Sequence, residues 1–170
     1  VGAAWRPALR APLGLLALLC IGGLFAYFGQ TYQTGADAWQ LFAVWAALAL
    51  PLCLGARSDV LWAPWALITL TAVSLWTFAY TGHSWRVEPQ DLSAFALAWL
   101  AAVGVVAVLS PALASWTGAG PWALRTSVTL SVMAVTLSAL GALFQKAVAP
   151  HYALALALMA IAAAVLALRK

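Results

Sequence analysis

Long apolar runs separated by short polar stretches dominate the chain. Each run is long enough to cross the hydrocarbon core of a bilayer as a helix, which takes about 20 residues. The runs are continuous and lack the polar alternation of a membrane-spanning barrel. We therefore predict an all-α, polytopic transmembrane helical bundle of about six spans in a single domain, residues 1–170, with spans at 11–29, 38–55, 60–80, 93–114, 122–144 and 151–168.

Composition strengthens this prediction and excludes a soluble domain. Apolar residues make up 66% of the chain, charged residues only 7%, and the mean hydropathy is +0.99. Such values are typical of an integral membrane protein whose main partner is the lipid bilayer. The basic residues are scattered at the ends of apolar runs and form no patch, so we expect no nucleic-acid partner.

The distribution of basic residues predicts the orientation of the chain. With six spans, six basic residues lie on the side of the termini and two, Arg86 and Lys146, on the opposite side. The positive-inside rule then places both termini in the cytoplasm of a bacterial cell, with the protein in the inner membrane. The basic residues on the side of the termini are Arg6, Arg10, Arg57, Arg125, Arg169 and Lys170.

The first apolar run follows Arg6 and Arg10, the order of charges found in a signal peptide. It is longer than a typical signal-peptide core, so we expect an uncleaved first span. The sequence begins with Val1 instead of Met, which leaves open whether further residues precede it.

A polar stretch between the first two spans carries a recurring pattern. It reads Gly29-Gln30-x-Tyr32-x4-Asp37-x7-Trp45-x5-Pro51. The pattern resembles that of a large family of uncharacterised bacterial polytopic membrane proteins, a domain of unknown function, over roughly residues 9–60. Members of that family are often longer, so we expect this chain to be a fragment or a shortened member. The resemblance implies a helical membrane protein and implies no activity, substrate or cofactor.

Polar residues at the outer rim are the candidate ligand-binding residues: Gln30, Tyr32, Asp37 and Asp91. In the structural interpretation, Gln30 and Tyr32 end the first span, and Asp37 and Asp91 are N-caps whose carboxylates accept hydrogen bonds from free backbone N–H groups. In the functional interpretation, the same groups contact a ligand or an ion.

Two pairs of spans share a sequence pattern. Asp37 precedes Trp45 by eight positions, and Asp91 precedes Trp99 by the same distance. The span that follows each pair begins Pro-Trp-Ala-Leu, at 64–67 and at 121–124. A duplicated two-span hairpin is one interpretation of this internal repeat.

Small and hydroxyl-bearing residues follow helical spacing in three spans. Gly22, Ala26 and Gly29 form a stripe that lets a neighbouring helix approach closely. Hydroxyl groups in the third and fifth spans either line a pathway for a small polar solute or hold helices together. These hydroxyls belong to Thr69, Thr71, Ser74, Thr77, Ser127, Ser131 and Ser138.

His83 and His151 are the candidate metal or haem ligands, on the same side as Asp37, Glu88 and Asp91. Their spacing matches no metal motif, and we expect no cofactor. Cys20 and Cys53 fall within spans and are expected to be reduced thiols.

The sequence shows no catalytic motif and no ionisable residue deep within a span, so we expect neither an enzyme nor an active transporter. The leading hypothesis is a non-catalytic accessory, assembly or sensing module that acts through helix packing and outer loops, with other membrane subunits or self-association as its contacts. The alternative is a facilitative carrier or binding protein for a small or lipid-like molecule, held among the second, third and fourth spans beneath Gln30 and Asp37. A haem- or metal-binding subunit of an oxidoreductase is third.

Overall fold

The computed structural model describes residues 5–32, 37–82, 88–143 and 149–168, and every regular element in them is a helix. In chain order these are α1 (Trp5–Tyr32), α2 (Ala38–Ala56), α3 (Asp59–Thr81), the short 3₁₀ turn η1 (Pro89–Asp91), α4 (Leu92–Val108), α5 (Ala114–Thr117), α6 (Pro121–Leu143) and α7 (Ala149–Leu168).

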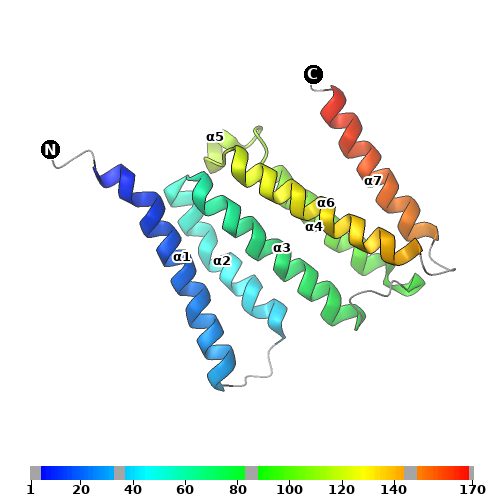
Figure 1. Ribbon diagram of the computed structural model, residues 1–170, viewed down its shortest axis with the longest axis horizontal. Coiled ribbons are helices and arrows are strands. Elements are labelled where there is room, and N and C mark those ends of the chain that lie inside the picture. The colour runs from blue at the N-terminus through cyan, green and yellow to red at the C-terminus, as the bar shows by residue number, and fades with distance from the viewer. Residues whose placement is uncertain (1–4, 33–36, 83–87, 144–148, 169–170) are drawn as a thin grey trace.

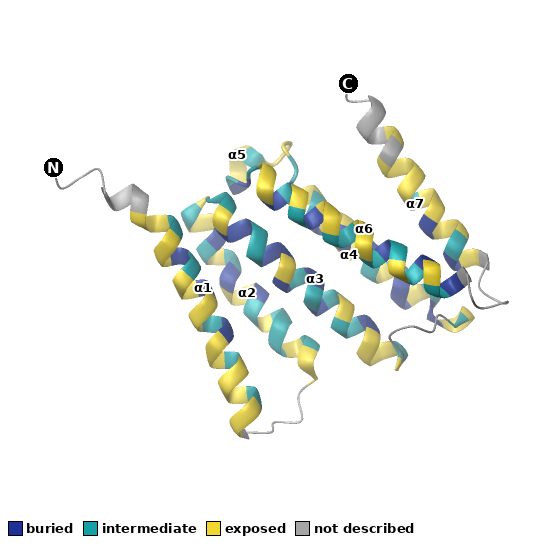
Figure 2. Cartoon of the chain, in the orientation of Figure 1, coloured by how far each residue is buried: buried dark blue, intermediate teal, exposed yellow. Residues whose placement is uncertain are grey.

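Helix α3 is the centre of the bundle. It packs against α2, α6, α4 and α1. In its most apolar stretch 44% of the residues are buried, against 17–28% in the other four long helices. Figure 1 shows α1, α2 and α3 side by side, α4 behind α6, and α7 leaning away from the bundle towards its C-terminal end. In Figure 2 the outer helices are mostly exposed, as expected for surfaces that face lipid.

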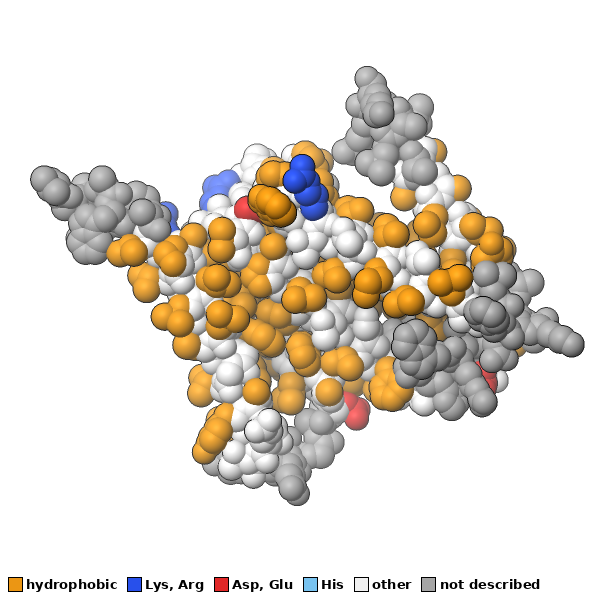
Figure 3. All heavy atoms as spheres, in the orientation of Figure 1, with side chains coloured by type: hydrophobic (Ala, Val, Ile, Leu, Met, Phe, Trp, Pro, Cys, Tyr) orange, Lys and Arg blue, Asp and Glu red, His pale blue; other side chains and the backbone are white. Residues whose placement is uncertain are grey.

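The prediction of an all-α polytopic bundle is confirmed. The described residues contain five helical segments of 19 to 23 residues that are apolar enough to cross a membrane. The sixth apolar run forms α7, of which a shorter stretch, Pro150–Ala162, meets the apolar criterion within the described part. Charged side chains lie near the helix ends, and Figure 3 shows hydrophobic side chains across the middle of the molecule.

The predicted fourth span, 93–114, is too long. Helix α4 ends at Val108, and its last ladder bond runs from the Leu109 N–H to the Val105 carbonyl at 3.1 Å. Pro111 has no N–H to continue the ladder, and it disfavours helical geometry at Ser110. The chain therefore turns before the short helix α5 begins.

Tryptophan indoles tie neighbouring helices together. The Trp45 indole of α2 donates to the Leu18 carbonyl of α1 at 2.9 Å, and the Trp65 indole of α3 donates to the Ala46 carbonyl of α2, also at 2.9 Å. A Cβ added at Gly22 would lie 2.3 Å from the Trp45 ring, so a glycine is what allows this ring to reach the backbone of α1. The predicted small-residue stripe is confirmed at Gly22.

At the α5 end of the bundle, Asp59 joins α3 to α6 by hydrogen bonds. This residue was not singled out in the sequence analysis. The Asp59 carboxylate, in the first turn of α3, accepts three backbone N–H groups at the start of α6: Gly120 at 3.0 Å, Trp122 at 2.8 Å and Ala123 at 2.7 Å. These are groups that a helix N-terminus leaves without intrahelical partners. Asp59 thus caps a helix that begins some sixty residues later in the chain.

Asp37 occupies the N-cap position of α2, as predicted, but its side chain makes no capping hydrogen bond. Asp91 precedes α4 and likewise makes no capping bond to that helix. Its carboxylate instead accepts the Glu88 N–H at 3.2 Å, within a capping box around η1.

The two copies of Pro-Trp-Ala-Leu occupy different positions in their helices. Pro121 is the first residue of α6, whereas α3 begins at Asp59 and Pro64 lies inside it. The duplicated hairpin stays a prediction.

Candidate ligand cavity

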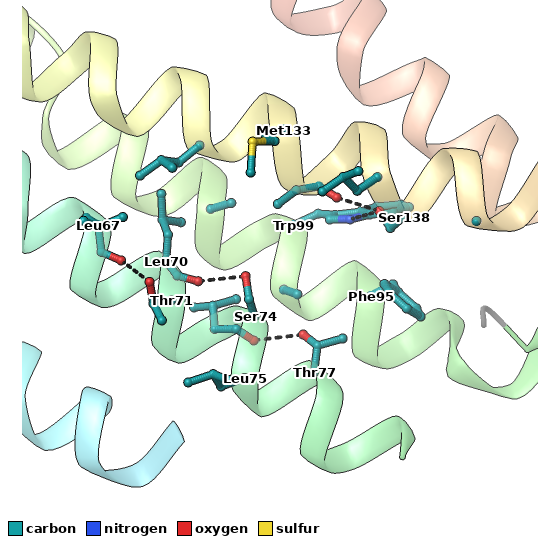
Figure 4. Close-up of a pocket in the computed structure, with 17 residues that line it drawn as sticks. Leu67, Leu70, Thr71, Ser74, Leu75, Thr77, Phe95, Trp99, Met133 and Ser138 are labelled. Atoms are coloured by element: carbon teal, nitrogen blue, oxygen red, sulfur yellow. Dashed lines mark hydrogen bonds between the residues drawn. The ribbon is translucent and has the colours of Figure 1, made fainter. Parts of the chain in front are cut away.

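A cavity of about 430 Å³ lies among α3, α4 and α6 (Figure 4). Its volume falls in the range of roughly 300–1,000 Å³ that is typical of small-molecule sites. Among the described residues that line it, none is charged. The apolar lining consists of Leu67, Leu70, Val73, Leu75, Phe95, Ala98, Trp99, Ala102, Leu130, Met133, Ala134, Leu137 and Gly141.

The hydroxyl groups in the cavity wall already donate hydrogen bonds. Thr71, Ser74 and Thr77 each donate to the carbonyl four residues earlier in α3, at 2.8, 2.9 and 2.9 Å. Ser138 donates within α6 and accepts the Trp99 indole N–H at 3.2 Å. The hydroxyl protons are therefore already used, and only weakly accepting oxygens remain for a ligand. The wall behaves as an apolar surface. The predicted role in holding helices together is confirmed at Ser138.

The cavity opens sideways between α3 and α6. Several of its lining residues are also exposed on the outer surface: Leu67 by 49%, Met133 by 56% and Leu137 by 41%. In Figure 3 this face carries hydrophobic side chains over both helices. Within a bilayer such an opening faces the acyl chains of the lipids, because this part of the protein lies between the helix ends.

Buried polar groups gather beyond one end of the cavity. His151, near the start of α7, is 1% exposed, and neither of its ring nitrogens has a hydrogen-bond partner among the residues that the structure describes. Phe95, which lines the cavity, stands edge-on to the His151 ring with the centroids 5.8 Å apart. Asp91 is 8% exposed and close enough to His151 to interact with it electrostatically. Phe95 thus separates the cavity from a pair of buried polar side chains.

The structure brings only some of the predicted site residues together. Asp91 and His151 lie near each other, whereas Gln30 and Asp37 are exposed at the α1–α2 end of the molecule, with α3 between that end and η1 (Figure 1). Tyr32 is the last residue of α1, and its side chain lies outside the described residues. His83 lies outside them as well.

The expected place of a cavity is wrong. It was predicted among the second, third and fourth spans beneath Gln30 and Asp37, but α2 contributes no described lining residue and α6 takes its place. A second hollow of about 380 Å³ is lined by residues of α1 and α2 alone, and two helices enclose less of a ligand than three do.

Metal-ligating side chains do not cluster in the part of the chain that the structure describes: no three of its His, Cys, Asp and Glu residues come together there. Cys20 and Cys53 are free thiols.

Comparison with known families supports the membrane assignment. Residues 2–62 match the family described as "Predicted membrane protein (DUF2157)". The match confirms the resemblance drawn from the pattern around Gln30, over α1, α2 and the start of α3. No curated protein and no solved structure matches the chain. Every described residue that lines the cavity lies beyond the matched residues.

Sequence reasoning missed Phe95 and Ala98 as lining residues. The i, i+4 aromatic pair Phe95 and Trp99 was the available signal, since such a pair presents two rings on one face of a helix. It did not reveal which helix would lie opposite that face.

Proposed function

We propose that this protein is a non-catalytic, multi-pass membrane protein that binds an apolar, lipid-like molecule in the cavity among α3, α4 and α6. The observation that carries the proposal is the sideways opening between α3 and α6, at Leu67, Met133 and Leu137. A molecule dissolved in the bilayer enters there without crossing water.

The chemistry of the wall favours an apolar ligand over a polar solute. A polar solute leaving water needs hydrogen-bond partners in the protein, and their absence costs several kcal/mol. The hydroxyl donors of Thr71, Ser74 and Thr77 are satisfied within α3. An acyl or isoprenoid chain needs no such partners, so it loses no hydrogen bonds when it enters the cavity.

Because of the cavity, we favour lipid binding over the accessory, assembly or sensing role. The exposed helix faces that would support association with other subunits are equally suited to lipid, so they favour neither. The oxidoreductase hypothesis retains only His83 and His151 and no cluster of ligands among the described residues.

We also propose a bacterial inner-membrane location with both termini in the cytoplasm. The described arginines Arg10, Arg57 and Arg125 lie at the helix ends on the side of α5, and Asp37 and Glu88 lie at the opposite ends. This arrangement follows the positive-inside rule.

Photolabelling tests the binding proposal. The purified protein in detergent is irradiated with an alkyl chain that carries a diazirine and no polar head, and labelled peptides are mapped by mass spectrometry. We expect saturable labelling of the lining residues of α3, α4 and α6. Ala98→Phe fills the cavity from α4 and should abolish it, whereas Ala101→Phe, the same change on the exposed side of α4, should not.

Two results would overturn the proposal. One is labelling that spreads evenly over exposed helix faces, including α1 and α7, and does not saturate. The other is saturable labelling that is equally strong in Ala98→Phe. Thermal unfolding of both variants verifies that they are folded.

A further inference from the structure

His151 is the least satisfied buried polar side chain in the described residues, with two ring nitrogens unpartnered and 1% of its surface exposed. A buried donor or acceptor without a partner destabilises the folded protein, so such a group calls for an explanation. Among the described residues, the ring of Phe95 stands edge-on to it, and the carboxylate of Asp91 is close enough to interact with it electrostatically.

These three residues lie at one end of the cavity. Along α4, Phe95 is the lining residue nearest to η1, and Asp91 is the last residue of η1. Along α6, Gly141 is the last lining residue before the chain passes to α7 and His151. A chain lying in the cavity therefore points one of its ends towards Phe95, with His151 and Asp91 behind it.

We propose that His151 and Asp91 receive the hydroxyl head of an amphiphile whose apolar chain occupies the cavity, and that the head reaches them by displacing the Phe95 side chain. This inference rests on the proposed function, since it assigns the polar end of the same ligand.

The hydrogen-bond donors and acceptors of His151 and Asp91 match a hydroxyl as the head group of the ligand. A neutral imidazole offers one N–H donor and one acceptor nitrogen, and an ionised carboxylate only accepts. A hydroxyl accepts the His151 N–H and donates to the carboxylate of Asp91, so both residues gain a partner. An anionic head such as a carboxylate would be repelled by Asp91, because two like charges in an apolar setting oppose each other.

The orientation also suits a membrane ligand. The buried pair lies beside η1, close to the end of the bundle, whereas the cavity extends along α3 to Leu67. A polar head near the membrane surface and a chain directed towards the centre is the arrangement that lipids adopt in a bilayer.

Competition against the diazirine chain tests the inference. 1-Dodecanol, dodecane and dodecylamine are added at equal mole fractions in detergent, and the amount that halves labelling of the cavity is measured for each. In the unaltered protein dodecanol should compete about tenfold better than dodecane, the order that one net hydrogen bond provides.

Two variants assign the preference to named groups. His151→Leu should bring dodecanol and dodecane to parity while leaving labelling by the apolar chain intact, and His151→Asn should retain part of the preference. Phe95→Ala should let dodecanol compete at least as well as in the unaltered protein. Leucine suits the apolar surroundings, so His151→Leu is expected to fold, which thermal unfolding checks.

Failure of the proposed function and failure of the assignment of His151 give different results. Labelling that does not map to the cavity contradicts the proposed function itself. Labelling that maps there with equal competition by dodecanol and dodecane, or a preference that survives His151→Leu, overturns only the assignment of His151. Stronger competition by dodecylamine than by dodecanol overturns the hydroxyl head and points to Asp91 as a receptor for a cation.

Discussion

The Asp59 carboxylate of α3 accepts the backbone N–H of Ala123 in α6 at 2.7 Å, joining the start of one helix to the start of another. Together with its bonds from Gly120 and Trp122, this contact fixes the angle at which α6 leaves the α5 end of the bundle. Because α3 and α6 form two of the three walls of the cavity, Asp59 positions the site without touching it.

Replacing Asp59 with alanine should lower the free energy of unfolding by about 1–3 kcal/mol, because it removes a cap and leaves several backbone N–H groups of α6 unpaired. Asp37→Ala is the matched control, since Asp37 is exposed and makes no capping hydrogen bond. Thermal unfolding in detergent measures both. Equal loss of stability in the two variants would contradict the role given to Asp59.

Gly22→Ala should destabilise the α1–α2 contact by about 1–3 kcal/mol, the usual cost of overpacking. The added Cβ would lie 2.3 Å from the Trp45 ring, which must then withdraw from the Leu18 carbonyl. The neighbouring change Gly23→Ala meets nothing within 4 Å and should be neutral or slightly stabilising. The difference in unfolding temperature between the two variants checks the prediction, and a larger effect at Gly23 would refute it.

Two glycines with positive φ allow the cost of backbone strain to be distinguished from the cost of steric crowding. Gly82 (φ 72°) and Gly118 (φ 67°) both adopt the left-handed region, so alanine at either position should cost about 1–2 kcal/mol. Only at Gly118 would the Cβ also collide with the backbone of Arg57, 2.7 Å from its carbonyl oxygen. Unfolding measurements should therefore show Gly118→Ala as the more damaging change, and equal effects would contradict a close contact between Arg57 and Gly118.

Orientation is tested by single added cysteines and a membrane-impermeant maleimide. Asp37→Cys should react from outside intact cells, whereas Ser115→Cys, at the exposed α5 end, should react only after permeabilisation. The unaltered protein is the control, because Cys20 and Cys53 lie within membrane helices. The reverse pattern of labelling would place the termini outside the cytoplasm.

Hydropathy predicted the helices well because the cost of exposing backbone to lipid makes helix length and apolar content nearly sufficient. The end of the fourth span is an exception. There the residues as far as Ala114 remain mostly apolar, but Pro111 interrupts the hydrogen-bond ladder. Covalent geometry, not hydropathy, ends that helix.

The site was far less predictable. Asp59 looks like an ordinary turn residue until α6 is placed beside it, because its partners follow some sixty residues later. Asp37 shows the converse, since its N-cap position was predictable while the absent capping bond was not. The cavity depends on which helices become neighbours, and in an apolar chain many pairings bury similar surfaces.

Native mass spectrometry of co-purified lipid tests the central claim most directly. The protein, Ala98→Phe and Ala101→Phe are released from detergent under identical conditions, and bound masses are recorded. The account predicts a discrete lipid-sized adduct on the unaltered protein and on Ala101→Phe, and its loss from Ala98→Phe. An adduct of equal abundance on all three, or none on any of them, would contradict a lipid-binding cavity among α3, α4 and α6.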